Sequence, residues 1–221
     1  MRTYKELKES FKNKKLFDLA LTHRSWLNEN DAKGSNERLE FLGDAILEFI
    51  VSRILYENFP EREEGFLTAL RAKLVNTVSL SQVAKNLELG KYLYLSKGEE
   101  ETGGRNNVSL LADTVEAVIG ALFLDLGIDA AQNFIDENIL FDLDKKAAEP
   151  LKDAKSMLQE IVQAKGSGTP RYQVISEEGP DHAKKFTIEV LVDGKSIGSG
   201  SGKNKSEAAQ NAAQAALERM L

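Results

Sequence analysis

The chain of 221 residues has no cysteine and only two histidines, His23 and His182. The absence of cysteine excludes disulfides, thiolate metal sites and thiol nucleophiles. Any metal must therefore be held by oxygen ligands or by these two histidines, and oxygen ligands favour hard cations such as Mg²⁺. A long hydrophobic run is also missing. The longest, 115–124, is interrupted by Glu116 and is well short of the ~20 residues that span a bilayer.

The amino-terminal segment lacks the apolar core of a secretory signal, because residues 1–10 are rich in charge. We therefore expect a cytoplasmic protein with no membrane partner. The length suits two domains, and a hydrophobic content of 42% is enough for ordinary cores.

The net charge of −6 argues at first against nucleic acid, since lysine and arginine drive phosphate binding. The charge is uneven, however. Residues 1–151 carry 19 basic and 26 acidic side chains, whereas residues 152–221 carry 10 basic and 9 acidic ones. The acidity is confined to the first part of the chain.

The hydrophobic period changes once along the chain. Up to residue 143, apolar residues recur every three or four positions, which is typical of an all-helical domain. Helices are predicted near 4–10, 14–21, 36–58, 64–86, 108–126 and 129–138. Between Leu95 and Val108, glycines, asparagines and acids indicate a mobile loop or a plain solvated connector.

The second part of the chain predicts a small α+β domain. A helix at 153–164 is followed by segments rich in β-branched and aromatic residues, which predict strands at 171–177 and 184–192. Asp193-Gly194 predicts a tight hairpin turn into a third strand near 195–199. An alanine-rich helix at 206–221 completes an α-β-β-β-α order. We place the domains at 1–146 and 153–221, joined by a linker at 147–152.

Five acids are spaced so as to share helix faces. Glu37, Glu40 and Asp44 lie within an arc of roughly 60° on one predicted helix, while Leu39, Leu42, Ile46 and Phe49 are predicted to pack on its opposite side. The other two acids lie three residues apart in a helix whose neighbours are nearly all apolar, at positions Asp113 and Glu116. Burying unpaired carboxylates is costly, so a divalent cation between the two helices is a natural solution.

These acids have two other conceivable roles. For any one acid, an interhelical salt bridge is the alternative, with Arg38, Arg53, Arg71 or Lys73 as partner. A di-iron carboxylate bundle uses Glu-x-x-His pairs, and neither histidine has an acid three residues before it. Glu48, one turn beyond Asp44, is expected to be solvated.

The motif N-E-R-L-E-F-L-G-D-A at 36–45 resembles the signature of the ribonuclease III family. The match extends to A-L-T-H-R-S at 20–25, E-E-G-F-L-T-A-L-R-A-K-L-V at 63–75 and A-D-T-V-E-A at 112–117, in the same order and spacing. The resemblance implies that the catalytic, Mg²⁺-coordinating set is Glu40, Asp44, Asp113 and Glu116. It further implies two acids that line the same cleft and assist binding or cleavage, Glu37 and Glu64.

This resemblance also implies a function. It predicts an all-α endonuclease domain that cleaves double-stranded RNA by in-line attack of a metal-activated water, leaving 5′-phosphate and 3′-hydroxyl ends, in the processing of ribosomal, messenger and other RNA. Mg²⁺ is the expected cofactor, with Mn²⁺ as a substitute and no organic cofactor.

A homodimer is implied, with Phe41 inserted into the partner; ordinary intrachain packing of Phe41 is the alternative. His23 is expected to be a hydrogen-bonded structural histidine. A non-cleaving RNA-binding protein and a purely structural helical dimer remain as rival functions.

Residues 152–221 resemble the double-stranded RNA-binding domain, which reads the shape of an A-form duplex. The resemblance implies that RNA is contacted by Gln159, Gln163, His182, Lys203 and Lys205; exposed glutamines on a solvated helix are the alternative for the first two. The family places lysines at positions that are Ser206 and Ala209 here. We therefore expect weaker RNA binding, with a shallower dependence on salt, than in a typical domain of this kind.

Overall fold

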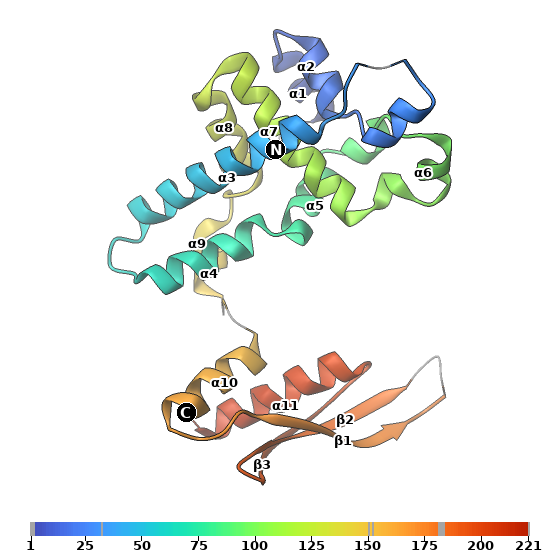
Figure 1. Ribbon diagram of the computed structural model, residues 1–221. Helices are drawn as coiled ribbons and strands as arrows, with labels where there is room; N and C mark the ends of the chain where they lie inside the picture. The colour runs from blue at the N-terminus through green and yellow to red at the C-terminus, as the bar shows by residue number, and fades with distance from the viewer. Residues whose placement is uncertain (1–2, 32, 150, 152, 181–183, 221) are drawn as a thin grey trace. The chain divides into compact units, whose positions relative to one another are not determined.

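The computed structural model describes residues 3–31, 33–149, 151, 153–180 and 184–220. The chain divides into two compact units, residues 1–149 and 150–221 (Figure 1). Each unit has its own secondary structure and its own core. In the parts of the chain that the structure describes, no helix is both long and apolar enough to cross a membrane.

The first unit is all-helical, as predicted. Its α-helices are α1 (Tyr4–Ser10), α2 (Lys14–Ala20), α3 (Glu37–Asn58), α4 (Glu64–Val75), α5 (Thr77–Asn86), α6 (Lys97–Glu101), α7 (Val108–Leu126), α8 (Ile128–Asn138) and α9 (Leu143–Ala148). Short 3₁₀ helices lie between them, which in the described residues are η1 (Arg24–Asn28), η2 (Leu89–Tyr92) and η3 (Gly104–Asn106).

The prediction of a single helix at 64–86 is wrong, because the helix is interrupted at Asn76. Its backbone is extended (φ −69°, ψ 160°), and its side-chain oxygen accepts the amide of Ser79 at 2.9 Å, which caps α5. The side-chain amide also donates to the carbonyls of Ala72 and Lys73 at the end of α4. The break lets α4 pack on α3 while α5 packs on α7.

The segment between Leu95 and Val108 is more ordered than a loop, since it contains α6 and η3. Arg105 ties it down, because one guanidinium nitrogen donates to the carbonyls of Gly90, Lys91 and Leu93 at 3.0 to 3.1 Å. The glycines and asparagines of the segment indicated a loop. The side chain of Arg105 instead fixes the segment to residues 90–93, because it satisfies three backbone carbonyls there.

Helix α7 is the centre of the first unit and is surrounded by α2, α3, α5 and α8 (Figure 1). Its residues Val115, Val118, Ile119 and Leu122 are buried. Burial on all sides explains the nearly continuous apolar sequence of this helix. It also makes α7 an unfavourable place for unpaired charge.

Two glycines let the backbones of α3 and α7 touch. A Cβ atom on Gly43 would lie 1.7 Å from the carbonyl oxygen of Glu116, and one on Gly120 would lie 2.3 Å from that of Leu39. Any larger residue at either position would push the helices apart. This close crossing lies where both helices carry the predicted metal-binding acids.

The second unit has the predicted α-β-β-β-α order, with α10 (Ala154–Ala164), β1 (Arg171–Glu178), β2 (Lys185–Val192), β3 (Lys195–Gly202) and α11 (Lys205–Met220). The strands form an antiparallel sheet in the order β1-β2-β3. The hairpin turn at Asp193 and Gly194 has positive φ at both residues (50° and 76°), as a tight two-residue connection requires. Apolar residues of α10, β2 and α11 form the core.

Candidate metal centre and RNA-binding surfaces

Three carboxylates converge at the crossing of α3 and α7. Glu40, Asp113 and Glu116 each offer one oxygen, and these oxygens lie within 4.8 Å of one another. All three side chains are partly buried. Oxygens of this kind and spacing can surround one hard divalent cation.

Asp44 lies beside this group rather than within it. It is exposed, one turn after Glu40 on α3, and its charge contributes to raising the pKa of both Glu40 and Glu116. Three of the four predicted ligands are thus brought together by the fold. The role of Asp44 as the fourth stays a prediction.

Burial and mutual repulsion raise the pKa of the carboxyl groups at the crossing. Burial, followed by the charges of Asp44, Asp113 and Glu40, raises the pKa of Glu116 to about 8. Burial, followed by the charge of Asp113, also raises the pKa of Glu40. Burial raises the pKa of Asp113, and the nearby His23 opposes that rise. Burial and repulsion therefore disfavour several ionised carboxylates side by side, and a bound cation would offset this cost.

The salt-bridge interpretation receives no support from three of its four candidate cations. Arg53 pairs with Glu57, Arg71 pairs with Glu48 at 2.8 Å, and Lys73 pairs with Glu149 at 2.9 Å. Glu48, which was expected to be solvated, keeps 39% of its side chain exposed and also pairs with Arg71, so that this contact links α3 to α4. The acids at the crossing of α3 and α7 remain a fit for a metal ion.

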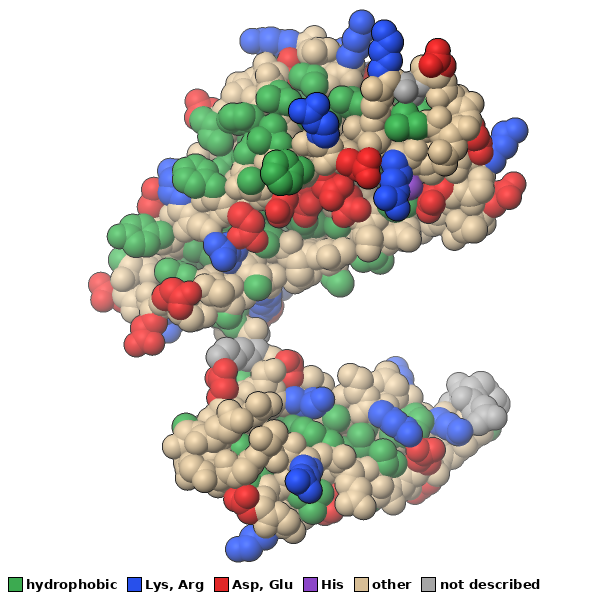
Figure 2. All heavy atoms as spheres, viewed as in Figure 1, with side chains coloured by type: hydrophobic (Ala, Val, Ile, Leu, Met, Phe, Trp, Pro, Cys, Tyr) green, Lys and Arg blue, Asp and Glu red, His purple; other side chains and the backbone are tan. Residues whose placement is uncertain are grey.

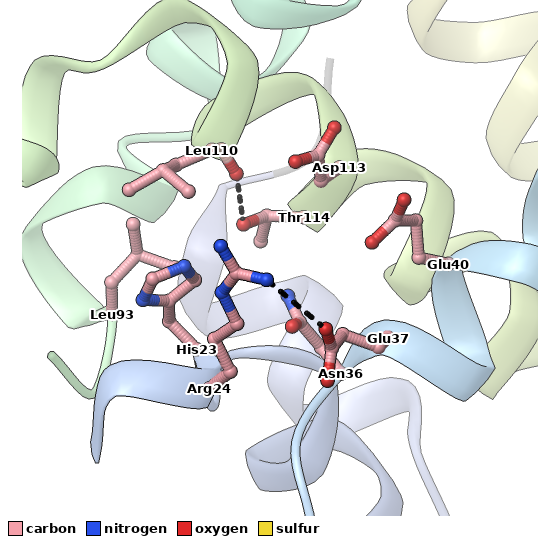
Figure 3. A pocket seen from close by; sticks show the side chains of 9 residues that line it. All are labelled: His23, Arg24, Asn36, Glu37, Glu40, Leu93, Leu110, Asp113 and Thr114. Carbon is pink, nitrogen blue, oxygen red and sulfur yellow. Dashed lines mark hydrogen bonds and ion pairs between the residues drawn. The ribbon is translucent and has the colours of Figure 1, made fainter. Parts of the chain in front are cut away.

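A cavity of about 230 Å³ adjoins the acid group. His23, Arg24 and Glu37 line it together with Glu40 and Asp113 (Figure 3). The fold therefore brings Glu37 beside the predicted ligands. The Nδ1 atom of His23 lies 2.9 Å from the hydroxyl of Ser25 and accepts the Ser25 amide, in keeping with the hydrogen-bonded histidine expected from the sequence.

Glu64 lies in a different place. It is the first residue of α4 and lines a separate groove of about 330 Å³ between α3 and α4. Phe49, Tyr56 and Arg71 also line this groove. The hydroxyl of Thr68 donates to its carboxylate at 2.9 Å. Glu64 lines this groove and Glu37 lines the cavity beside the acid group, so the two acids predicted to assist the reaction are not neighbours in this structure.

Three aromatic side chains of α3 are exposed, and we call them the α3 aromatic strip: Phe41 (79% exposed), Phe49 (60%) and Tyr56 (74%). The prediction that Phe49 packs inward was wrong. Spacings of eight and seven residues place the three on one side of the helix, and this regularity was the signal in the sequence. Figure 2 shows hydrophobic side chains gathered on the viewed face of the first unit, next to a row of acidic ones.

The predicted RNA-binding residues of the second unit lie on its surface where they are described. Gln159 and Gln163 are exposed on α10, and Lys203 and Lys205 are exposed at the start of α11. His182 lies outside the described residues.

The start of α11 carries a carboxylate where a phosphate ligand would be expected. Glu207 accepts the backbone amide of Lys203 at 2.8 Å, and Lys205 pairs with Glu177 at 3.1 Å. Of the two positions without lysine, Ser206 is exposed and Ala209 is buried. These contacts reduce the positive charge available at this helix end.

Comparisons with known proteins agree with both units. A family model described as Ribonuclease-III-like matches residues 13–143, and one described as Double-stranded RNA binding motif matches residues 154–220. Ribonuclease 3 of Geobacillus kaustophilus is 48% identical over 211 residues, which cover 95% of this chain and 86% of that protein. Ribonuclease 3 of Natranaerobius thermophilus is 47% identical over 219 residues, covering 97% of this chain and 95% of its own.

Solved structures agree for the first unit. The crystal structure of the nuclease domain of ribonuclease III from Campylobacter jejuni is 38% identical, with a TM-score of 0.57, and covers 64% of this chain and 97% of its own. A second structure of that domain, described as showing flexibility in a region involved in dimer formation, has 40% identity and a TM-score of 0.55, and covers 61% of this chain and 96% of its own. With the family match across 13–143 and relatives that align over nearly the whole length, this chain belongs to the ribonuclease III family.

Proposed function

We propose that this protein is an endoribonuclease that hydrolyses phosphodiester bonds of double-stranded RNA. The observation that carries the proposal is the convergence of carboxylates from α3 and α7 beside an open cavity. The family and the RNA-binding motif in the second unit supply the substrate class. A duplex RNA substrate, with a role in processing ribosomal and other RNA, accords with the cytoplasmic location expected from the sequence.

The metal of the proposed reaction is Mg²⁺, with Mn²⁺ as a substitute, held by Glu40, Asp44, Asp113 and Glu116. A divalent ion at such a site lowers the pKa of bound water and stabilises charge on phosphate oxygens. The side chains of the site hold the ion with hard oxygen ligands. Glu116 must give up its proton to bind the ion, since its pKa is about 8 in the metal-free protein. The expected products carry 5′-phosphate and 3′-hydroxyl ends.

The test is cleavage of a labelled RNA duplex by the wild type and by Glu116→Gln, in Mg²⁺ and in EDTA. The substitution removes a ligand charge with little change of shape, so we expect duplex binding to persist while cleavage falls at least a hundredfold, about 2.7 kcal/mol or more of lost transition-state stabilisation. Glu101→Gln on exposed α6 is the matched control and should cleave like the wild type. Wild-type turnover by Glu116→Gln would refute the site assignment. Duplex binding without cleavage by the wild type would instead favour the rival, a non-cleaving RNA-binding protein.

We further propose that the α3 aromatic strip is the interface of a homodimer. An aromatic side chain as exposed as Phe41 is unusual on a monomer, and three on one helix side form an apolar patch that a second copy would bury. The sequence resemblance implies the same role for Phe41.

Sedimentation velocity tests the dimer. Phe41→Asp should shift the protein to monomer at micromolar concentration, whereas Ile175→Asp, which alters an exposed apolar residue of the second unit, should not. A Phe41→Asp protein that sediments as a dimer would exclude this interface.

For the second unit we propose that Gln159, Gln163, Lys203 and Lys205 contact the duplex, with His182 between the first two strands as a further contact. Exposure of the two glutamines and two lysines supports the proposal. The pairing of Lys205 with Glu177 has to be broken for Lys205 to reach a phosphate, which is another reason to expect modest affinity.

A further inference from the structure

We propose that Arg24 binds a phosphate of the substrate that flanks the scissile one, and that the cavity beside the acid group is the subsite for this phosphate. The inference rests on the proposed function and adds to it a substrate-binding residue in the first unit. Arg24 follows His23 at the start of η1, well before the helices that carry the acids.

The geometry points to a ligand that lies between Arg24 and the metal-binding acids. Arg24 and His23 line one side of the cavity, and Glu40 and Asp113 line the other (Figure 3). The volume of about 230 Å³ is ample for a phosphate group. A phosphate in this cavity would lie close to a second phosphate whose oxygen is held at the acid group. Consecutive phosphates of one RNA strand are neighbours in the same way.

The present partner of Arg24 holds it only weakly. The guanidinium lies 3.8 Å from the carboxylate of Glu37, and the two side chains are 73% and 56% exposed. Ion pairs this long and this exposed contribute little to stability. Arg24 can therefore exchange Glu37 for a phosphate at small cost, and a planar guanidinium offers two parallel donors to phosphate oxygens.

Charge favours the same occupant. The acid group repels RNA, and Arg24 is close enough for its charge to lower the pKa of Glu40, against the rise caused by burial. A cation on the far side of the cavity from the acids would attract the strand to the position where its neighbouring phosphate meets the metal. A carboxylate ligand from a small molecule would satisfy Arg24 equally well, but it would not extend the negative charge along the cleft as RNA does.

The first experiment compares cleavage of a labelled duplex by wild type, Arg24→Gln, Arg24→Lys and Arg38→Gln. We expect Arg24→Gln to lower kcat/KM about tenfold, as for loss of one hydrogen bond to a charged group, and Arg24→Lys to recover part of the loss. Arg38 is the matched control, because it is also exposed, lies on the first turn of α3 and does not line the cavity. Arg38→Gln should cleave like the wild type.

The second experiment separates phosphate binding from a structural role. Duplex binding is measured against salt in the Glu116→Gln background, where Arg24→Gln should reduce the slope of log K against log salt by about 1. A single uncharged methylphosphonate is then placed at each position around the cut. At one position it should slow the wild type but leave Arg24→Gln almost unaffected, since both changes remove the same contact.

The outcomes are distinguishable. If the wild type does not cleave duplex RNA, the proposed function fails before the subsite is tested. If the wild type cleaves but Arg24→Gln cleaves equally well, or if every methylphosphonate is additive with Arg24→Gln, the subsite is refuted. A loss of activity in Glu37→Gln that equals the loss in Arg24→Gln, with no change of salt slope in either, would assign Arg24 a structural pairing role and overturn the proposal. Arg24-dependent inhibition by inorganic phosphate, with no methylphosphonate coupling, would make the occupant a free ion and overturn it as well.

Discussion

Replacing Gly43 with alanine puts a methyl group into the crossing of α3 and α7. The methyl carbon would lie 1.7 Å from the carbonyl oxygen of Glu116, and 3.0 Å is about the shortest such approach that real structures show, so the backbones must separate by roughly 1.3 Å. Overpacking of a tight contact costs about 1–3 kcal/mol, and this clash is with rigid backbone, which places the cost near 3. Alanine recovers about 1 kcal/mol through its higher helix propensity. We therefore expect Gly43→Ala to lose about 2 kcal/mol of stability.

The site should suffer more than the fold. The atom that the methyl group displaces belongs to Glu116, which is itself one of the three grouped acids, so a separation of this size takes its carboxylate away from that of Glu40. Mg²⁺ affinity and cleavage should fall by an order of magnitude or more at temperatures where the protein is still folded, because metal sites depend on ligand placement within a few tenths of an ångström.

Three measurements check this prediction: thermal unfolding, Mg²⁺ titration by calorimetry, and cleavage of a labelled duplex. A loss of 2 kcal/mol corresponds to a melting temperature lower by about 4–8 °C for a protein of this size. Gly65→Ala on α4 is the matched control, since a Cβ there meets no atom within 4 Å, and it should be neutral or slightly stabilising. If Gly43→Ala melts and cleaves like the wild type, the close backbone crossing does not set the site.

Three further predictions concern charge and capping. With chelator present, the protein should lose stability as the pH rises from about 4.5 to 8. Folding raises the pKa of Glu116 from 4.5 to about 8, so the unfolded chain releases this proton at a lower pH than the folded protein does. Thermal melts across this pH range should show a smaller loss of stability for Glu116→Gln than for the wild type. Ser206→Lys should strengthen duplex binding in a filter or fluorescence titration and steepen its salt slope by about 1, whereas an unchanged slope would mean that the start of α11 does not meet phosphate. Asn76→Ala should lower the free energy of unfolding in urea by about 1 kcal/mol, since it removes the cap of α5; no loss would show that the break between α4 and α5 does not depend on this side chain.

Much of the architecture could be predicted because the apolar residues of the long helices in the first unit recur every three or four positions. Hydrophobic periodicity predicted the bounds of α3 and α7 to within one residue. The Asp193-Gly194 pair correctly predicted the turn between β2 and β3. The break at Asn76 could not be predicted from periodicity, since apolar residues continue in step on both sides of it. Only the capping potential of the asparagine distinguished that position.

The candidate site was predictable in its residues but not in its geometry. Spacing placed Glu40 on one helix face and Asp113 and Glu116 on another, yet the meeting of these three acids depends on Gly43 and Gly120, which periodicity treats as neutral. The separate position of Glu64 arises from tertiary packing of α4 against α3, which no local pattern encodes. The exposure of Phe49 was missed because hydrophobic periodicity assigns every apolar residue to the buried side of a helix.

Helix α3 carries Glu40 of the acid group, one side of the backbone crossing and the α3 aromatic strip within 22 residues. Ordinary surface helices tolerate most substitutions on the side that faces solvent. In α3 that side carries the proposed dimer interface, so a scan of all single substitutions should find few permissive positions around its whole circumference. Exposed positions such as Phe41 should be among the intolerant ones, and a stability calculation on one isolated chain would miss them. The amphipathic α8, which has a plain solvated face, should show the usual alternation between sensitive and tolerant sides.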